Sequence, residues 1–164
     1  MIVDRENIQH GITEGVDIIV LSGSSGYPIV GNEQQLQKEM LLVRHSKVPV
    51  IGICYGCELI VNTFGGVLEQ MNEKKKGIID IEVIVPDPIF GGRQRFEVYE
   101  GHRWRIKELP VGFIDLARSK HGIEAVKHKE LPIYGLQFHP EKFVDETYGD
   151  EILRNIIKQV VSTS

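Results

Sequence analysis

An apolar run that breaks at a cysteine between two glycines constrains this chain more than any other feature. Residues 48–53 are typical of a buried strand, and Cys54 follows with Gly52 and Gly56 two positions away on either side. The pattern G-x-C-x-G is the cysteine form of a nucleophile elbow, in which a strand turns sharply into a helix and exposes the residue between them. Glycines let the backbone make such a turn without a Cβ clash. The segment therefore predicts a strand, an elbow and a helix.

A histidine and a glutamate, His139 and Glu141, flank Pro140 in the last part of the chain. Proline disfavours helical geometry in the residue before it, so His139 is expected in an extended segment, where residues two apart share a face. Glu141 would then hold one imidazole nitrogen while the other faces Cys54. The sequence therefore predicts a catalytic triad of Cys54, His139 and Glu141. The helix N-terminus after Cys54 favours a thiolate, which predicts an unusually acidic thiol.

The remaining segments alternate between strand and helix patterns, which indicates one α/β domain over residues 1–164. A continuous apolar run at 16–21 is typical of a strand in a parallel sheet, and a Gly/Ser-rich loop follows it. Helices are expected from Asn32, from the elbow to Phe64, and over 148–161. Antiparallel strands joined by Pro and Gly turns are expected at 78–85, 95–99, 113–117, 123–127 and 133–138.

Composition and charge exclude several classes of function. The 164 residues carry a net charge of −4 and give a sequence pI of about 5.9, so nucleic-acid or anionic-membrane binding has no electrostatic support. No apolar run reaches the ~18 residues of a membrane span, and the first residues lack the regions of a signal peptide. Two cysteines three positions apart cannot form a disulfide framework, which indicates a reducing, cytoplasmic environment.

Cys54 and Cys57 also form a C-x-x-C pair, a pattern shared by redox proteins and by half of a zinc site. The chain has no further cysteine, and the elbow context gives Cys54 a different role. Cys57 is therefore interpreted as a small apolar residue on the inner helix face. Neither a metal nor a cofactor is expected. The charged run at 73–76 is interpreted as a solvated turn.

Three segments together resemble class I glutamine amidotransferase domains: residues 52–56, the Gly65-Gly66 pair, and residues 134–141. The resemblance covers nearly the whole chain, and the tail at 148–155 is most similar to the glutaminase part of GMP synthetase. It implies a flavodoxin-like, doubly wound α/β fold with a mostly parallel sheet, helices on both faces and a small antiparallel strand group.

The resemblance implies hydrolysis of the glutamine side-chain amide through a thioester on Cys54. His139 would move the proton, Glu141 would fix its tautomer, and backbone N–H groups of Ser24 and Tyr55 would stabilise the oxyanion. The ammonia would pass to a separate ATP-dependent synthetase, because this chain has no G-x-x-x-x-G-K-[ST] phosphate loop. The residues implied in binding glutamine or a γ-glutamyl compound are Gly23, Gly52, Glu58, His102, Arg103 and Trp104.

The chain departs from the family pattern in three places. Family members usually begin with a strand and helix before the segment that matches residues 1–7, so the usual first strand and helix are expected to be lacking. Ser24 and Ser25 stand where the oxyanion loop usually has glycine and proline. Glu58 replaces the glutamine usually found four residues after the nucleophile.

These departures leave two alternative functions open. Glu58 and the lack of a synthetase domain favour a stand-alone hydrolase of γ-glutamyl compounds, since hydrolases of that kind carry glutamate at this position. The short N-terminus and the altered oxyanion loop favour a catalytically weak regulatory relative. The three triad residues argue against the latter, because a binding module has no need of them.

Overall fold

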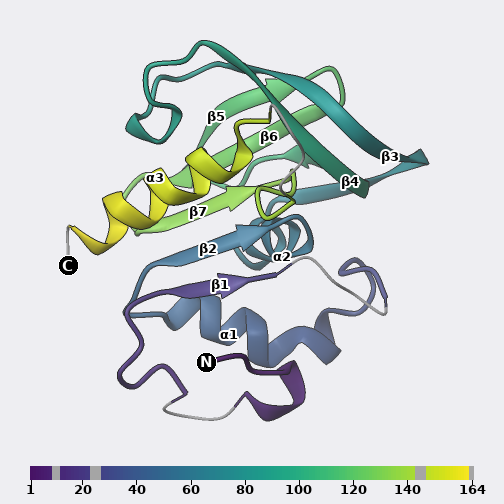
Figure 1. Cartoon of the computed structure of the whole chain (residues 1–164). Coiled ribbons are helices and arrows are strands. Elements are labelled where there is room, and N and C mark those ends of the chain that lie inside the picture. Colours follow the sequence, from purple (N-terminus) through teal and green to yellow (C-terminus); the bar gives the residue numbers. More distant parts are fainter. Residues whose placement is uncertain (9–11, 23–26, 143–146, 163–164) are drawn as a thin grey trace.

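The computed structural model describes residues 1–8, 12–22, 27–142 and 147–162 (Figure 1). Its seven-stranded sheet has the order β1-β2-β7-β6-β5-β3-β4. The strands are β1 Ile19–Leu21, β2 Val50–Ile53, β3 Val67–Val83, β4 Arg95–Glu108, β5 Phe113–Ser119, β6 Gly122–His128 and β7 Ile133–Leu136. The helices are α1 Gln37–His45, α2 Tyr55–Thr63 and α3 Gly149–Val161, with 3-10 turns η1 Arg5–Asn7, η2 Glu33–Leu36 and η3 Pro88–Phe90. No described helix has the length and apolar character of a membrane span.

Parallel pairing is confined to one end of the sheet. β2 pairs in parallel with β1 on one side and with β7 on the other, whereas β7-β6, β6-β5, β5-β3 and β3-β4 are all antiparallel. The sheet of the described residues is thus mixed, and the expectation of a mostly parallel sheet holds only for this end. The reason is connectivity, since parallel neighbours need a long crossover whereas short turns give antiparallel ones.

Helices cover both faces of the parallel end, as expected (Figure 1). Side chains alternate along β2, so Val50 packs with residues of α1 and α2 while Ile51 and Ile53 face the opposite side. On that opposite side they share a hydrophobic cluster with Ile152 and Ile156 of α3. The α/β class is therefore confirmed, and the carboxyl ends of β1, β2 and β7 meet at one edge of the sheet.

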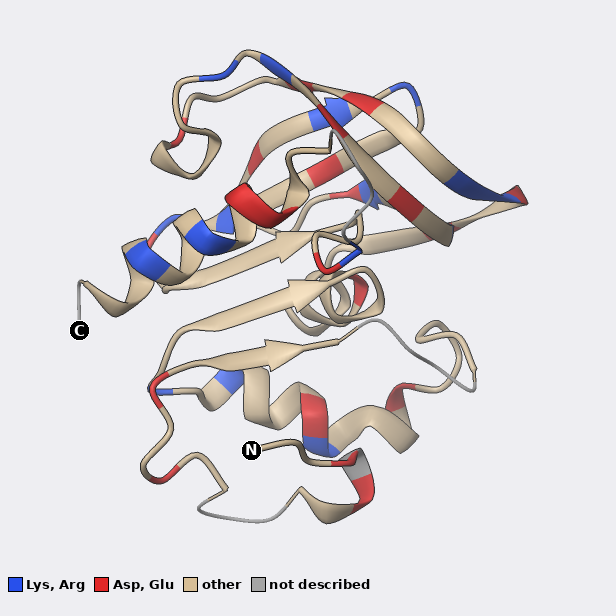
Figure 2. Cartoon of the chain, viewed as in Figure 1, with Lys and Arg blue, Asp and Glu red and all other residues tan. Residues whose placement is uncertain are grey.

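Strands β3 and β4 form a long hairpin that is more extensive than the sequence predicts. The charged run at 73–76 lies within β3, and Lys75 and Lys76 pair with His102 and Gly101 of β4, so its interpretation as a turn is wrong. Partly exposed strands tolerate Lys and Glu because the ladder satisfies the backbone while the side chains reach water. Figure 2 shows these charges along the hairpin, whereas β1, β2 and β7 carry none.

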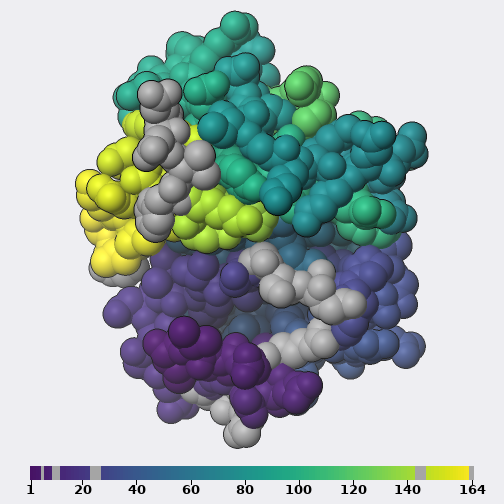
Figure 3. All heavy atoms as spheres, turned by 45° about the vertical axis from the view of Figure 1, so that its right-hand side comes forward, coloured from purple at the N-terminus to yellow at the C-terminus, as the bar shows by residue number. Residues whose placement is uncertain are grey.

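β1 lies at one edge of the sheet and is shorter than the apolar run at 16–21. The lack of a family strand before it stays a prediction. In the space-filling view the hairpin lies above the N-terminal part of the chain, and the C-terminal residues lie to one side (Figure 3).

Candidate functional site

Cys54 occupies the elbow that its flanking glycines predict. It lies between the end of β2 and the start of α2, and its backbone has φ 50° and ψ −104°. Among the described residues other than glycine, it alone has a positive φ. The amide N of Cys54 donates to the carbonyl of Leu136 in β7 at 2.7 Å. Strained backbone of this kind persists only where neighbouring contacts enforce it, and it clusters at functional sites.

The two elbow glycines allow α2 to approach the sheet closely. A Cβ on Gly56 would lie 2.2 Å from the carbonyl oxygen of Leu21, at the end of β1. A Cβ on Gly52 would lie 2.5 Å from the backbone of Gly56 and 2.6 Å from Ile60. Any side chain at either position would push the helix away from the strands. Close packing therefore accounts for Gly52, and its part in substrate binding stays a prediction.

His139 and Glu141 are in direct contact beside the carboxyl end of β7. The imidazole Nδ1 lies 2.7 Å from Oε1 of Glu141, and the His139 amide donates to the carbonyl of Tyr99 at 2.8 Å. Because a carboxylate only accepts hydrogen bonds, Nδ1 carries the proton and Nε2 is the free nitrogen of the neutral ring. β7 ends at Leu136, so the strand expected to reach residue 138 is shorter. A turn closed by Lys142 N–H on the His139 carbonyl brings Glu141 back to the ring.

A pocket of about 550 Å³ brings the predicted residues together. Those lining it are Cys54, Tyr55, Glu58, His102, Arg103, Trp104 and His139. Ser24 and Gly23 lie outside the described residues. Glu141 reaches the pocket through His139. The structure thus places the nucleophile candidate and the histidine candidate, which follow the neighbouring parallel strands β2 and β7, in one cavity.

Several pocket residues were not predicted from the sequence. Lys74 and Gln70 come from β3, because the long hairpin extends over the pocket. Lys142 directly follows the motif with His139, and its Nζ lies 4.8 Å from the Tyr99 ring centroid. Lys74 belongs to the charged run interpreted as a turn, so its position needed the strand pairing. The signal available for Lys142 was its adjacency to Glu141. Other lining residues are Tyr27, Pro28 and Gly101.

The Cys54 thiol is not acidic in this structure. Burial raises its pKa to about 12, and the negative charge of Glu58 adds to the rise, while the Tyr55 N–H acts in the opposite direction. The prediction of an unusually acidic thiol is therefore wrong for the unliganded protein. The effect of desolvation on the pKa is larger than that of the helix N-terminus, because removing the thiolate from water costs more free energy than the helix dipole provides by stabilising it.

Glu58 lies on the nucleophile side of α2, as its spacing from Cys54 predicts. It is 5% exposed, and its Oε1 accepts a hydrogen bond from Gln137 Nε2 at 2.9 Å. Burial raises the pKa of Glu58 to about 7, although the Gln137 hydrogen bond and the charge of His102 act against the rise. An ionised Glu58 therefore destabilises both the folded protein and a neighbouring thiolate.

Glu58→Gln is expected to stabilise the folded protein in a pH-dependent way. A carboxyl pKa raised by folding gives stability that is fully present below the unfolded value, near 4.5, and lost as the pH rises through about 7. Glutamine keeps the Gln137 contact without the charge, so the gain should be on the order of 2–3 kcal/mol at pH 8 and close to zero at pH 4.5. Urea unfolding at both pH values measures it, with the exposed Glu73→Gln as control. An equal effect at both pH values would contradict the assignment.

A cysteine elbow after β2, with a contacting His–Glu pair just beyond the carboxyl end of the neighbouring strand β7, sets this α/β protein apart by its site as well as by its fold. A family model described as glutamine amidotransferase class-I matches residues 2–160. The chain belongs to this family.

Several proteins that are similar to this chain are named as GMP synthases or as subunits of one. It is 43% identical over 136 residues to one subunit of the glutamine-hydrolysing GMP synthase of Pyrococcus abyssi, covering 82% of this chain and 72% of that protein. It is 37% identical over 120 residues to the glutamine-hydrolysing GMP synthase of Thermosipho melanesiensis, covering 72% of this chain and 23% of that protein. The crystal structure of a putative GMP synthase subunit from Thermoplasma acidophilum superposes with a TM-score of 0.80 at 32% identity, covering 92% of this chain and 75% of that one.

Proposed function

We propose that this chain is a glutaminase that hydrolyses the side-chain amide of glutamine and supplies the ammonia to a separate synthetase subunit. The observation that carries the proposal is the single pocket in which Cys54, on its elbow, and His139, held by Glu141, lie together. Membership of the glutamine amidotransferase class-I family supports the reaction type. One domain over residues 1–164 and a cytoplasmic location belong to the same proposal.

In the proposed reaction, Cys54 Sγ attacks the side-chain carbonyl carbon of glutamine while the thiol proton moves to Nε2 of His139. The tetrahedral intermediate collapses to a thioester as His139 returns the proton to the departing ammonia. Water, deprotonated by the same nitrogen, then hydrolyses the thioester to glutamate. Glu141 keeps Nδ1 protonated throughout, so Nε2 stays available as the base. Because burial raises the pKa of Cys54 to about 12, proton transfer has to accompany the attack.

The oxyanion of the intermediate needs donors that are already in place. The Tyr55 N–H begins α2 and lies beside the Cys54 sulfur, close to where the carbonyl oxygen of an attacked substrate would sit. A donor of this kind is worth ~3–4 kcal/mol in the transition state. We assign it the oxyanion role, with the Ser24 N–H as the second donor.

The charges around the pocket suit the zwitterionic end of glutamine. Lys74, Arg103 and Lys142 line the pocket and offer cations for an α-carboxylate. Glu58 lines the same cavity and offers a carboxylate for the α-ammonium group. A substrate held by these groups would extend its amide toward Cys54. Trp104 and His102 would complete the pocket wall.

The names of the relatives support a partner chain. The Pyrococcus abyssi protein is named as one subunit of a GMP synthase, and the matching segment makes up only 23% of the Thermosipho melanesiensis protein. We propose that an ATP-dependent synthetase of this type receives the ammonia.

The isolated chain is expected to be a weak glutaminase that the synthetase activates. The high pKa of the Cys54 thiol calls for a rearrangement that docking would supply. The partner should raise kcat/KM by at least about tenfold, or ~1.4 kcal/mol. Glutamate release, measured with and without the synthetase subunit from the same organism, gives the result, and Cys54→Ala serves as the blank. Turnover of the free chain on the order of 10 s⁻¹ would contradict this expectation and favour a stand-alone hydrolase.

A further inference from the structure

Three buried ionisable side chains converge between strands that are not neighbours in the sheet. Glu100 and His102 lie two residues apart on β4 and share one face, and Glu124 meets them from β6. Their exposures are 4%, 3% and 1%, and one ligand atom from each lies within 4.8 Å of the other two. Two buried carboxylates and one imidazole are costly to keep together unless a positive charge compensates them.

The hydrogen bonds around this cluster determine which atoms point inward. His102 Nδ1 lies 2.7 Å from the carbonyl oxygen of Trp104, and since a carbonyl only accepts, Nδ1 carries a proton. This leaves His102 Nε2 directed into the cluster, 3.3 Å from Glu100 Oε2. Within the described residues, Nε2 makes no hydrogen bond of ordinary geometry. This separation is an ion pair only when Nε2 is also protonated, and a metal ion bound to Nε2 would take the place of that proton.

The two carboxylate oxygens of Glu124 also differ in their contacts, as the two ring nitrogens of His102 do. Its Oε1 accepts a hydrogen bond from the Ser119 hydroxyl at 2.7 Å. Its Oε2 is buried and has no hydrogen-bond partner in the described part of the chain. The cluster therefore contains two deeply buried polar atoms, from different strands, that make no hydrogen bond of ordinary geometry within the described residues.

This arrangement resembles a metal site, in which some atoms bind the ion directly and neighbouring groups orient them by hydrogen bonds. Ligands at the distances usual for Zn²⁺ lie roughly 3.3–3.6 Å from one another in tetrahedral geometry, and His102 Nε2 and Glu100 Oε2 already do so. An Nδ1–H bonded to a backbone carbonyl is the usual outer contact of a metal-binding histidine. His121 Nδ1, 2.9 Å from Glu100 Oε2, would orient that carboxylate in the same way. One imidazole and two carboxylates suit a transition-metal dication rather than Ca²⁺ or Mg²⁺.

We propose that Glu100, His102 and Glu124 form a binding site for one transition-metal dication that joins β4 to β6. The proposal departs from the sequence-based expectation that this chain binds no metal. His102 also lines the glutaminase pocket, and Arg103 and Trp104 follow it on β4. A bound ion would therefore fix the strand that forms one wall of that pocket. Metal binding itself does not depend on the proposed glutaminase activity.

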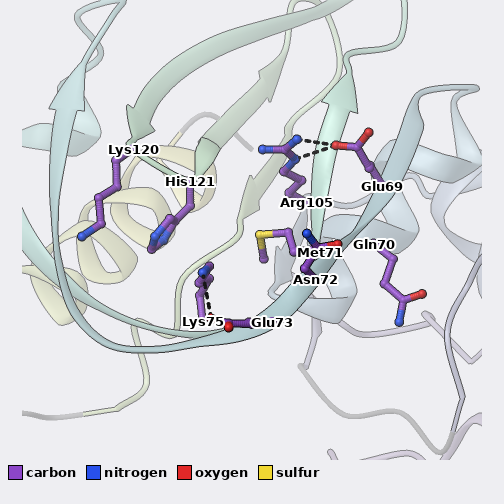
Figure 4. A pocket seen from close by; sticks show the side chains of 9 residues that line it. All are labelled: Glu69, Gln70, Met71, Asn72, Glu73, Lys75, Arg105, Lys120 and His121. Carbon is purple, nitrogen blue, oxygen red and sulfur yellow. Dashed lines mark hydrogen bonds and ion pairs between the residues drawn. The ribbon is translucent and has the colours of Figure 1, made fainter.

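A second pocket lies beside the cluster, on the side of His121. It has a volume of about 580 Å³ and lies under the β3–β4 hairpin, where His121 and Lys120 project toward it from the β5–β6 turn (Figure 4). On the opposite wall Arg105 is paired with Glu69. His121 lines this pocket and contacts Glu100, so it is the residue that connects the pocket to the buried cluster.

The test is titration of the full chain, freed of metal with a chelator, with Zn²⁺ in a calorimeter, accompanied by thermal unfolding. We expect one Zn²⁺ per chain and a higher unfolding temperature with Zn²⁺. Glu100→Gln and Glu124→Gln should each weaken binding at least tenfold. Glu97→Gln, an exposed change on the same strand, and Cys54→Ala should leave it unchanged. Failure of the wild type to bind, or unchanged binding by both cluster variants, would overturn the proposal.

Co²⁺ spectroscopy of the unaltered protein covers the case in which the cluster variants fail to fold. Nitrogen and oxygen ligation is expected to give visible d–d bands without the intense near-ultraviolet band of a cobalt–thiolate bond. A thiolate band would place the metal at Cys54 or Cys57 and would overturn the assignment. The absence of any visible bands at saturating Co²⁺ would do the same.

Discussion

Cys54→Ala is expected to reduce glutamine hydrolysis by about 10⁴–10⁶-fold while the protein stays folded. The change removes the proposed nucleophile, and the second thiol cannot replace it. Cys57 is fully buried, and a Cβ on Gly135 would lie 2.7 Å from its sulfur, so Cys57 faces the sheet rather than the pocket. Alanine has the same backbone restriction as cysteine at φ 50°, so the elbow geometry should survive. Glutamate release at saturating glutamine measures the loss, and circular dichroism checks the fold.

Cys57→Ala is the matched control for this experiment. It removes the other thiol of the same helix from a packed position, so it should cost some stability but retain activity to within about tenfold. A Cys54→Ala protein that kept more than about one hundredth of the wild-type rate would refute the thioester route. Equal losses in the two variants would mean that the effect arises from the helix rather than from the nucleophile.

His139→Ala is expected to slow acylation by about 10²–10⁴-fold, and adding Glu141→Ala should cause little further loss. Glu141 acts on the reaction only by holding the His139 ring, which lies 2.7 Å away, so without the ring it has nothing to orient. The single variant Glu141→Ala should be slower than wild type but faster than His139→Ala. The penalties of residues that act as one unit do not add.

Single-turnover formation of the acyl-enzyme in the two single variants and the double variant gives the comparison. Glu130→Ala, at an exposed position in the β6–β7 turn, is the control for loss of a surface carboxylate. A double variant whose loss equals the product of the two single losses would show that His139 and Glu141 act independently.

The elbow could be predicted from the sequence, because the strand, the cysteine and its two glycines are adjacent in the chain. The glycines at 52 and 56 mark a close approach, and the structure shows that a Cβ added to Gly56 would clash with Leu21. The contact between His139 and Glu141 was also predicted, but it forms through a turn closed by Lys142 rather than along a strand. The spacing of the two residues predicted their contact, but it did not predict the turn in the backbone between them.

Properties set by tertiary contacts could not be predicted. The length of the β3–β4 hairpin depends on pairing between distant segments, and the lysines at 74–76 resemble a turn in sequence. The pKa of Cys54 depends on burial and on Glu58, which outweigh the helix terminus that the sequence did indicate. The Glu100–His102–Glu124 cluster forms because β4 and β6 meet in space, and no motif joins these positions in the chain.

Alkylation by a glutamine analogue with an electrophilic diazoketone in place of the amide tests the proposed nucleophile most directly. The reagent enters as a substrate would and captures the attacking sulfur, so peptide mass spectrometry identifies the residue. We expect the label on Cys54 alone, with Cys57 unmodified, and at least tenfold slower labelling in His139→Ala. Equal labelling of both cysteines, or an unchanged rate in His139→Ala, would contradict the proposal that Cys54 and His139 form the catalytic pair.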